Sequence, residues 1–140
     1  MTTIVYANNE MAWDSRITSG GAISTDNAQK RYTVGGCTFW CAGTVGDFQE
    51  FCEAYASRKT ARELEVTAFV LDSGKLYLTS SDGPDVWTSP VVDARSIGSG
   101  SHHAITAIDC GCTPAGAVKM AAKRDSCTGG KIRTQKLRLS

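Results

Sequence analysis

The sequence predicts a single α+β domain spanning residues 1–140, and three observations lead to that prediction. A length of 140 residues matches the usual size of one domain, about 100–200 residues. Short stretches of alternating apolar and polar residues, typical of strands, fill most of the first two thirds of the chain. Helical repeats interrupt this alternation once in mid-chain and replace it near the C-terminal end. Hairpins followed by helices are typical of a layered α+β domain.

The strands are expected to begin with a hairpin. Residues 3–7 and 10–15 flank Asn8-Asn9, a pair that tolerates the positive φ angles of a two-residue turn. Further strands are expected at residues 30–34, 37–41 (running on into Ala42-Gly43), 64–71, 75–79, 86–87, 94–97 and 132–139.

Helices are expected in three places. From Thr44 to about Arg58 the apolar residues recur every three to four positions, which predicts an amphipathic helix. Residues 101–109 form a short apolar helix that ends near Gly111. A clearer helix begins at Thr113-Pro114, where an N-cap precedes a proline at the first helical position, and ends around residues 123–125.

Composition excludes several classes of protein. Lysine and arginine total 15 against 14 acidic residues, a near-neutral balance that lacks the basic surface of a nucleic-acid or membrane-surface protein. No apolar run approaches the roughly 20 residues of a membrane span, and the N-terminal residues do not resemble an export signal. The six cysteines are therefore expected to be reduced thiols in a cytoplasmic protein.

Common catalytic and metal motifs are absent from the sequence. It has no G-x-S-x-G nucleophile elbow, no Walker loop and no H-E-x-x-H. Gly98-Ser99-Gly100 lacks the third glycine of a dinucleotide fingerprint, so no cofactor is expected. No metal site is expected either, because the spacing fits no zinc pattern among His102, His103, Cys110, Cys112 and Cys127.

The second residue suggests a different chemistry. A small residue after Met1 favours removal of the initiator, which would leave Thr2 with a hydroxyl and a free α-amine. An α-amine has a pKa of about 7.7–8.0, so near neutral pH it can act as a general base for the neighbouring hydroxyl. A threonine activated by its own amine is a recognised nucleophile, and the chain is expected to be inactive while Met1 is retained.

Six short motifs follow one another in the order found in a known superfamily. They are Thr2-Thr3-Ile4-Val5, Asp14-Ser15-Arg16, Lys30-Arg31, residues 42–47, residues 98–101 and residues 124–130. Taken together, they resemble the proteasome β-subunit superfamily of N-terminal nucleophile hydrolases, which includes the HslV-type peptidases. The resemblance extends from Thr2 to about Leu137. It implies an αββα sandwich in which two antiparallel sheets are stacked between helical layers.

The resemblance assigns a role to each matching residue. Thr2 supplies the attacking oxygen, Lys30 stabilises the developing alkoxide, and Asp14 holds that lysine. Gly43 provides the backbone N–H of the oxyanion hole at the start of a helix. The threonine amine is oriented by a hydroxyl–carboxylate–hydroxyl set formed by Ser99, Asp125 and Thr128.

Substrate contacts are implied in the same way. Thr18 and Gly20 resemble the strand that pairs with an extended substrate backbone. An uncharged pocket for the residue before the scissile bond is implied by Ala28, Tyr32, Cys41 and Val45.

Each residue also has a structural alternative when it is taken singly. Asp14 and Lys30 could form an ordinary surface ion pair, Gly43 could close a turn, and Thr44 could be only an N-cap. Ser99 could satisfy loop amides, and Asp125 could cap a helix. His102 and His103 are interpreted as helix-surface or subunit-contact groups, not as catalytic ones.

The sequence departs from the superfamily in two places. The first hairpin is about four residues shorter, and one helix stands between Gly43 and the next strand where the family has two. One helical layer should therefore be reduced, and the known ring assemblies transfer weakly.

The leading interpretation is a cytoplasmic threonine endopeptidase that acts on peptides or unfolded proteins. It is expected to assemble as a homo-oligomer, a ring or a related assembly, with a lone subunit as the alternative, and an AAA+ unfoldase ATPase is a candidate partner. The alternatives are a catalytically inactive assembly or binding subunit of the same fold and, more remotely, a small Cys/His metal-binding module.

Overall fold

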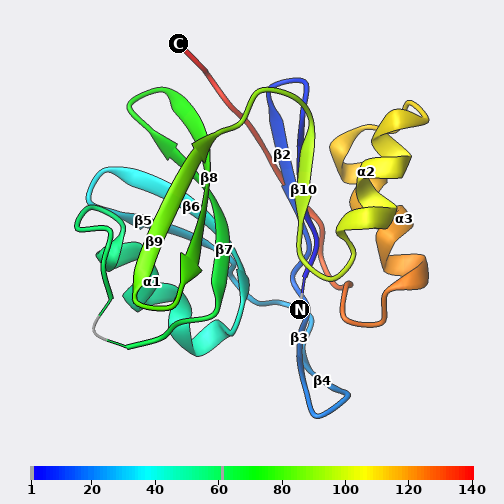
Figure 1. The fold of residues 1–140 in the computed structure, drawn as a ribbon. Helices are drawn as coiled ribbons and strands as arrows, with labels where there is room; N and C mark the ends of the chain where they lie inside the picture. The colour runs from blue at the N-terminus through cyan, green and yellow to red at the C-terminus, as the bar shows by residue number, and fades with distance from the viewer. Residues whose placement is uncertain (1, 61) are drawn as a thin grey trace. The chain divides into compact units, whose positions relative to one another are not determined.

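The computed structural model describes residues 2–60 and 62–140, so the expectation about Met1 lies outside the described residues. The described chain divides into two compact units (Figure 1). Unit 1 comprises residues 2–30 and 92–138, and unit 2 comprises residues 31–60, 62–91 and 139–140. Each unit contains an antiparallel sheet with helical cover, as the α+β assignment requires. That residues 1–140 form one domain remains a prediction.

The sheet of unit 1 has four antiparallel strands in the order β10-β1-β2-β11. Their bounds are Ile4–Ala7 (β1), Glu10–Trp13 (β2), Arg95–Ile97 (β10) and Arg133–Lys136 (β11). The turn between β1 and β2 is formed by Asn8 and Asn9 at φ 51° and 61°, which confirms the predicted two-residue hairpin.

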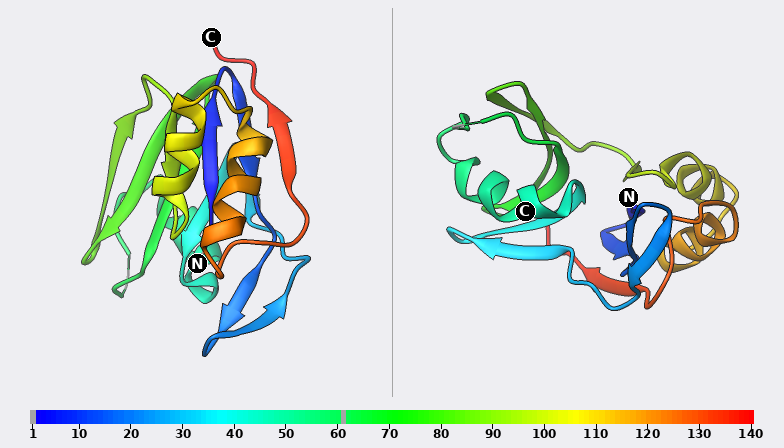
Figure 2. Two further views of the ribbon diagram at one scale, coloured as in Figure 1. Left: turned by 90° about the vertical axis from the view of Figure 1, so that its right-hand side faces the viewer. Right: turned by 90° about the horizontal axis from the view of Figure 1, so that it is seen from below.

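Helices α2 (Ser101–Asp109) and α3 (Pro114–Arg124) pack together and against β1 and β2 (Figure 2). Small side chains make this packing close, and the core between helices and sheet consists of Val5, Ala12, Ala104, Ala107, Ala117, Val118 and Ala121. At the start of α3, the Thr113 side chain accepts a hydrogen bond from the Gly116 amide, which confirms the predicted N-cap.

A further hairpin in unit 1 was not predicted from residue alternation, although the resemblance implied a strand at Thr18 and Gly20. Strands β3 (Ile17–Ser19) and β4 (Ala22–Thr25) pair with each other as a separate two-stranded sheet. Their turn is Gly20-Gly21, with φ of 57° and 83°. The hairpin is largely exposed, so its residues lack the alternation of a half-buried strand from which strands are predicted.

The sheet of unit 2 has five antiparallel strands in sequence order, β5-β6-β7-β8-β9. Their bounds are Arg31–Val34 (β5), Cys37–Gly43 (β6), Val66–Asp72 (β7), Lys75–Asp82 (β8) and Asp85–Pro90 (β9). A core of aromatic and branched side chains lies between this sheet and helix α1 (Phe48–Ala54), and includes Phe39, Phe48, Phe51, Tyr55, Leu64, Val66 and Val70.

The helix expected from Thr44 to about Arg58 is shorter than predicted. It consists of a 3₁₀ turn η1 (Val45–Asp47) and then the seven residues of α1. After α1 the Ser57 hydroxyl and amide both donate to the Ala54 carbonyl, and Arg58 has φ 62°, so the chain leaves the helix there. Among the described residues between β6 and β7, these are the helical segments, which agrees with the expected reduced helical layer.

No helix in the described part of the chain is long and apolar enough to cross a membrane.

Candidate active site

Thr2 lies two residues before the start of β1 in unit 1, with 1% of its surface exposed. Its hydroxyl oxygen accepts a hydrogen bond from the Lys30 Nζ and donates one to Asp14 Oδ1. Its backbone nitrogen donates to Ser99 Oγ at 3.2 Å. One residue therefore contacts an ammonium, a carboxylate and a second hydroxyl, although these groups are spread over almost a hundred positions of sequence.

Asp14 is fully buried at the end of β2, and both of its carboxylate oxygens are hydrogen-bonded. Besides Thr2, Oδ1 accepts from Lys30 Nζ at 2.8 Å and from the Thr3 amide at 3.1 Å. Oδ2 accepts from the backbone amides of Gly129 at 3.0 Å and Arg16 at 3.3 Å. These charge-assisted hydrogen bonds replace the hydrogen bonds to water that the carboxylate loses on burial, and so they offset the cost of burying its charge.

Lys30 ends the segment after β4 and is 1% exposed, so its charge is also removed from water. Burial lowers the pKa of Lys30 below its usual value, and the neighbouring Asp14 carboxylate opposes this effect. The surface ion pair considered as an alternative for Asp14 and Lys30 is thus wrong, because the pair is buried. Such a pair contributes little to stability, but it places a positive charge against the Thr2 oxygen.

Ser99, Asp125 and Thr128 lie together on the other side of the Thr2 nitrogen. Asp125 Oδ2 accepts hydrogen bonds from the Ser99 hydroxyl at 2.6 Å and from the Thr128 hydroxyl at 2.7 Å, and Oδ1 accepts from the Cys127 amide at 3.1 Å. Because the Ser99 proton points to Asp125, the Ser99 oxygen is free to accept from the Thr2 nitrogen. Burial raises the pKa of Asp125, but these hydrogen bonds outweigh it and hold the pKa below its usual value.

Thr3 is a neighbour that the sequence reasoning missed. Its fully buried hydroxyl lies 2.7 Å from the Thr128 hydroxyl, and since that group donates to Asp125, Thr3 is the donor. The sequence contained a pattern that could have identified Thr3 as part of the site, because the Thr2-Thr3 pair places two hydroxyls at the start of an otherwise apolar strand.

Two glycines make the approach to Thr2 possible. A side chain on Gly98 would overlap the Thr2 carbonyl, and one on Gly100 would overlap the Thr3 hydroxyl. The Gly100 amide donates to the Thr2 carbonyl at 3.3 Å. The glycines of the Gly98-Ser99-Gly100 segment therefore serve close packing around Thr2 and Thr3.

Arg16 supports the turn after α3. Its guanidinium pairs with Asp26 at 2.8 Å and donates to the Ser126 carbonyl at 3.0 Å, while a side chain on Gly129 would collide with it. These contacts hold the segment from Asp125 to Gly129 in place. This segment supplies hydrogen-bond donors to both carboxylates of the site, those of Asp14 and Asp125.

Gly43, the expected oxyanion donor, lies in unit 2 as the last residue of β6. It has φ 123°, and a side chain there would overlap the Glu65 carbonyl, so only glycine fits without strain. Thr44 follows as the N-cap of η1 without a side-chain capping bond. Gly43 thus stands before a helical turn, as expected, and its role in catalysis remains a prediction.

The expected substrate-binding residues are divided between the units. In unit 1, Thr18 lies in β3, Gly20 in the exposed turn after it, and buried Ala28 donates its amide to Ser15. In unit 2, Tyr32 packs edge-on against Phe48, Val45 is 37% exposed, and Cys41 is fully buried with its Sγ 3.7 Å from that of Cys52. Their contacts with substrate remain predictions.

Within residues 2–60 and 62–140, no group of three or more His, Cys, Asp or Glu side chains is arranged to hold a metal ion. All six cysteines are free thiols.

Comparisons with known proteins bear on the fold. No family model matches the sequence, and no curated protein is detectably similar to it in sequence. Solved structures are similar: BPH of Thiobacillus denitrificans in complex with epoxomicin has a TM-score of 0.72 at 15% identity, covering 99% of this chain and 98% of that one. Eukaryotic HslV from Trypanosoma brucei has a TM-score of 0.69 at 17% identity, covering 98% of both chains. The chain therefore has the fold of the HslV/proteasome-type peptidases, which is the fold that the motifs implied.

Proposed function

We propose that this protein is a threonine endopeptidase that cleaves peptide bonds through an acyl-enzyme on Thr2. One observation supports the proposal most strongly. The Thr2 hydroxyl contacts both members of a buried Lys30–Asp14 ion pair, and the Thr2 nitrogen contacts Ser99. Burying such a pair gives little stability, which favours a chemical role for it.

In the proposed reaction the Thr2 oxygen attacks the carbonyl carbon of the scissile bond and its proton passes to the Thr2 amine, directly or through a water. The C–N bond then breaks, and the amine product leaves with that proton. A water molecule hydrolyses the resulting ester and returns the hydroxyl to Thr2. Gly43 is the proposed donor to the oxyanion, on the resemblance alone.

The amine acts as a base only when it is free and unprotonated. The mechanism therefore requires removal of Met1, because an amide nitrogen is not basic. The Lys30 charge close by disfavours protonation of the amine, and the Ser99 oxygen orients it. Lys30 and Asp14 are proposed catalytic residues because both touch the reacting oxygen, and so is Ser99 because it touches the nitrogen that serves as base. Asp125 and Thr128 are positioning residues.

The proposal extends to the setting of the reaction. An extended substrate pairs with the strand that includes Thr18, and the uncharged side chains of Ala28, Tyr32, Cys41 and Val45 favour an apolar residue before the scissile bond. We place the protein in the cytoplasm as a homo-oligomer that acts on peptides or unfolded chains, with an AAA+ unfoldase as candidate partner.

Covalent labelling tests the proposal directly. Chain shown by intact mass to lack Met1 is incubated with epoxomicin, and peptide mapping locates the adduct. We expect one adduct per chain, on Thr2. Thr2→Ala should abolish it, and Thr2→Ser, which keeps a hydroxyl, should retain slower labelling.

The same experiment separates the main alternative. A Met1-free, folded chain that is never labelled and cleaves no peptide library would contradict the peptidase and favour a non-catalytic assembly subunit. Chain that retains Met1 serves as the internal negative control.

A further inference from the structure

The hydroxyl of Thr3 is fully buried beside the candidate site, and the proposed mechanism gives it no part. Thr3 stands directly before β1, and its hydroxyl oxygen lies 2.7 Å from that of Thr128 in the turn after α3. From the turn before α2, Gly100 approaches so closely that a side chain there would overlap the Thr3 hydroxyl. Three segments of unit 1 that are far apart in sequence therefore meet at one hydroxyl.

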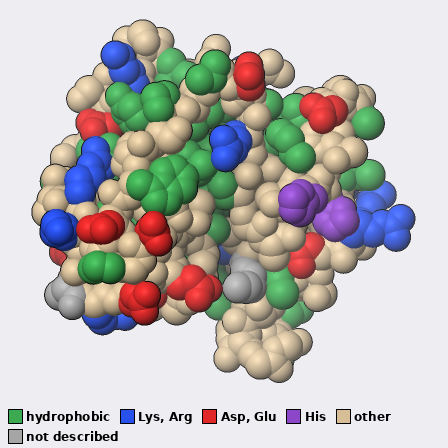
Figure 3. All heavy atoms as spheres, in the orientation of Figure 1, with side chains coloured by type: hydrophobic (Ala, Val, Ile, Leu, Met, Phe, Trp, Pro, Cys, Tyr) green, Lys and Arg blue, Asp and Glu red, His purple; other side chains and the backbone are tan. Residues whose placement is uncertain are grey.

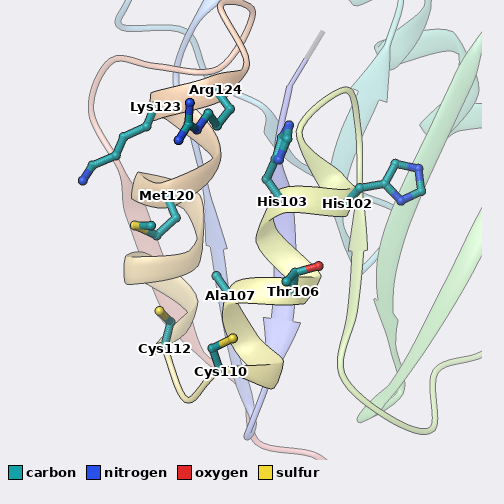
Figure 4. Close-up of a pocket in the computed structure, with 9 residues that line it drawn as sticks. All are labelled: His102, His103, Thr106, Ala107, Cys110, Cys112, Met120, Lys123 and Arg124. Atoms are coloured by element: carbon teal, nitrogen blue, oxygen red, sulfur yellow. The ribbon is translucent and has the colours of Figure 1, made fainter.

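Helices α2 and α3 bring two of these segments to the same end of the helix pair. The first turn of α2, which contains His103, lies beside the last turn of α3, which contains Arg124 (Figure 4). The turn with Gly100 enters α2 at this end, and the turn with Thr128 leaves α3 there. Both histidines of the chain are exposed (Figure 3), whereas Thr3 and Thr128 are fully buried. The contact between the two threonine hydroxyls is therefore shielded from water.

The same two turns carry the groups that hold the Thr2 nitrogen. Ser99 accepts a hydrogen bond from the Thr2 nitrogen at 3.2 Å and donates one to Asp125 Oδ2 at 2.6 Å. Thr128 donates to the same Asp125 oxygen at 2.7 Å. A displacement of Thr128 therefore changes the position of the Asp125 carboxylate, and with it the position of Ser99.

The direction of these hydrogen bonds gives Thr3 a defined part. Although burial raises the pKa of Asp125, its hydrogen bonds hold the pKa below the usual value, so the ionised carboxylate only accepts near neutral pH. The single proton of Thr128 then points to Asp125, and the Thr128 oxygen accepts the proton of Thr3. In such a chain each hydrogen bond polarises and strengthens the next one.

The backbone of Thr3 is fixed as well. Its amide donates to Asp14 Oδ1 at 3.1 Å, and its carbonyl accepts from the Asp14 amide at 3.2 Å. The same Oδ1 contacts the Thr2 hydroxyl. Thr3 is thus linked to both carboxylates of the site, directly to Asp14 and through Thr128 to Asp125.

We propose that Thr3 is a positioning residue of the peptidase reaction, whose hydroxyl acts through Thr128 and Asp125 to hold the Thr2 amine in place for proton transfer. This role rests on the proposed function, in which that amine is the base. A carbon atom in place of the hydroxyl would keep the Thr128 oxygen at about 3.3–3.6 Å, so Thr128 would retreat by roughly 0.6 Å or more from its 2.7 Å contact. Thr128 would also lose a buried hydrogen-bond donor.

The rate of covalent labelling in Met1-free chain tests this role. Thr3→Val keeps the shape of the side chain and removes the hydroxyl, and rates at several epoxomicin concentrations separate the covalent step from initial binding. We expect the covalent step to slow by about 10-fold or more, because a misplacement of about 1 Å can cost about 100-fold. The epoxomicin concentration at half-maximal rate should change by less than about three-fold, because the buried Thr3 hydroxyl is out of reach of the inhibitor.

Two further variants distinguish the hydroxyl from the packing of the side chain. Thr3→Ser keeps the hydroxyl and loses the methyl group, so labelling should stay within about three-fold of the parent rate. A role in packing alone predicts the reverse order, with Thr3→Val as the milder change. Thr3→Ala lacks the hydroxyl and needs no extra space, so it should also slow the covalent step, and the test does not depend on the folding of a single variant.

A double variant shows whether Thr3 acts through Thr128. Thr128→Ala alone should slow labelling, and adding Thr3→Val to it should slow labelling by less than about three-fold more. The physical reason is that the Thr3 hydroxyl has no partner to hold once the Thr128 hydroxyl is gone. Equal slowing by Thr3→Val with and without Thr128 would contradict this route.

Thr79→Val in unit 2 is the matched control. Thr79 is also fully buried, and its hydroxyl donates to the Trp87 carbonyl at 3.0 Å, so the variant makes the same exchange outside unit 1 and should leave labelling unchanged. Parent-like labelling of folded Thr3→Val, or equal slowing by Thr3→Ser, would overturn the role of Thr3 while the labelled parent still supports the peptidase. A parent chain that is never labelled would instead contradict the proposed function, and the role of Thr3 with it.

Discussion

The two units are built from the same parts but differ in the side chains that fill the space between sheet and helices. In unit 2 the space between sheet and helix holds aromatic and branched side chains such as Phe39, Phe51 and Val70, all fully buried. In unit 1 small apolar residues pack under α2 and α3. Unit 1 also buries polar residues at and around the candidate site, namely Thr2, Thr3, Asp14, Ser15, Lys30 and Thr128.

The contrast shows that burial serves two purposes in this chain. Burying Phe51 removes apolar surface from water and stabilises the fold by about 1.5–3 kcal/mol. Burying Lys30 with Asp14 removes two charges from water, and their attraction does little more than offset that cost. Unit 2 is therefore expected to dominate stability, and unit 1 to carry the chemistry.

Lys30→Met should have the largest effect and tests the chemical half of this comparison. It removes the positive charge beside the Thr2 oxygen, so labelling by epoxomicin should slow by about 10²–10³-fold. It also leaves the Asp14 charge buried without its partner, which should lower the free energy of unfolding by about 3–5 kcal/mol. Urea denaturation and the labelling rate measure the two effects.

A second substitution separates these two effects. Adding Asp14→Asn to Lys30→Met should restore part of the lost stability, because it removes the unpaired buried charge while the side-chain oxygen can still accept from a backbone amide. It should not restore labelling. Lys59→Met in unit 2 is the matched control: its ion pair with Asp85 is exposed, so neither measurement should change. Recovery of labelling in the double variant would contradict the role given to Lys30.

Phe51→Ala tests the other half of the comparison. It opens a cavity in the core of unit 2 and should lower the free energy of unfolding by about 3–5 kcal/mol. Labelling of Thr2, measured where the variant is still folded, should change by less than about three-fold. A labelling loss as large as that of Lys30→Met would show that the two units do not divide stability and chemistry in this way.

Two aspartates with lowered pKa allow the units to be compared by pH. In unit 1 burial raises the pKa of Asp125, but its hydrogen bonds hold it below the ordinary value of 3.8. In unit 2 the Glu65 amide is the main cause of the lowered pKa of Asp47, against burial and with help from Arg62. A carboxyl group whose pKa is lower in the folded protein than in the unfolded chain stabilises the folded state. This stabilisation is fully present above the pKa of the group in the unfolded chain, and it is lost as the pH falls through its pKa in the folded protein.

Asp125→Asn and Asp47→Asn should therefore both destabilise the protein at pH 7, and the difference from the parent should shrink as pH falls below about 4. Chemical denaturation across this range gives the measurement. Labelling at pH 7 should slow in Asp125→Asn alone, since that carboxylate positions Ser99. Equal slowing in Asp47→Asn would count against that positioning role.

The two helix starts give the smallest expected effect. Thr113 caps α3 with its side chain, so Thr113→Ala should cost about 1 kcal/mol of stability. Thr44 occupies the N-cap position of η1 without such a bond, so Thr44→Ala should stay within about 0.5 kcal/mol. Thermal unfolding of the two variants, measured side by side, shows which threonine contributes more to stability. A larger loss of stability in Thr44→Ala than in Thr113→Ala would contradict this assignment of the capping residue.

Local patterns predicted much of the architecture. The Asn8-Asn9 turn, the helix from residues 101 to 109 and the Thr113 cap all depend on residues adjacent in sequence, and each was found where expected. Residue alternation missed the exposed β3–β4 hairpin, of which only the resemblance implied a strand at Thr18, because neither face of the hairpin is buried enough to impose an alternating pattern. The helix after Thr44 was predicted too long, since its apolar spacing continues to Tyr55 whereas the α-helix consists only of Phe48–Ala54.

By itself, the sequence determined which residues have chemistry to offer and, through the order of its motifs, the fold that carries them. Only the tertiary structure decided that Thr2, Asp14, Lys30 and Ser99 meet, and that the Lys30–Asp14 pair is buried and not solvated. It also revealed the supporting contacts of Thr3, Arg16 and Gly129. The reason is that these hydrogen bonds join residues 12 to 125 positions apart, so they depend on strand pairing and helix packing, for which no local pattern carries a signal.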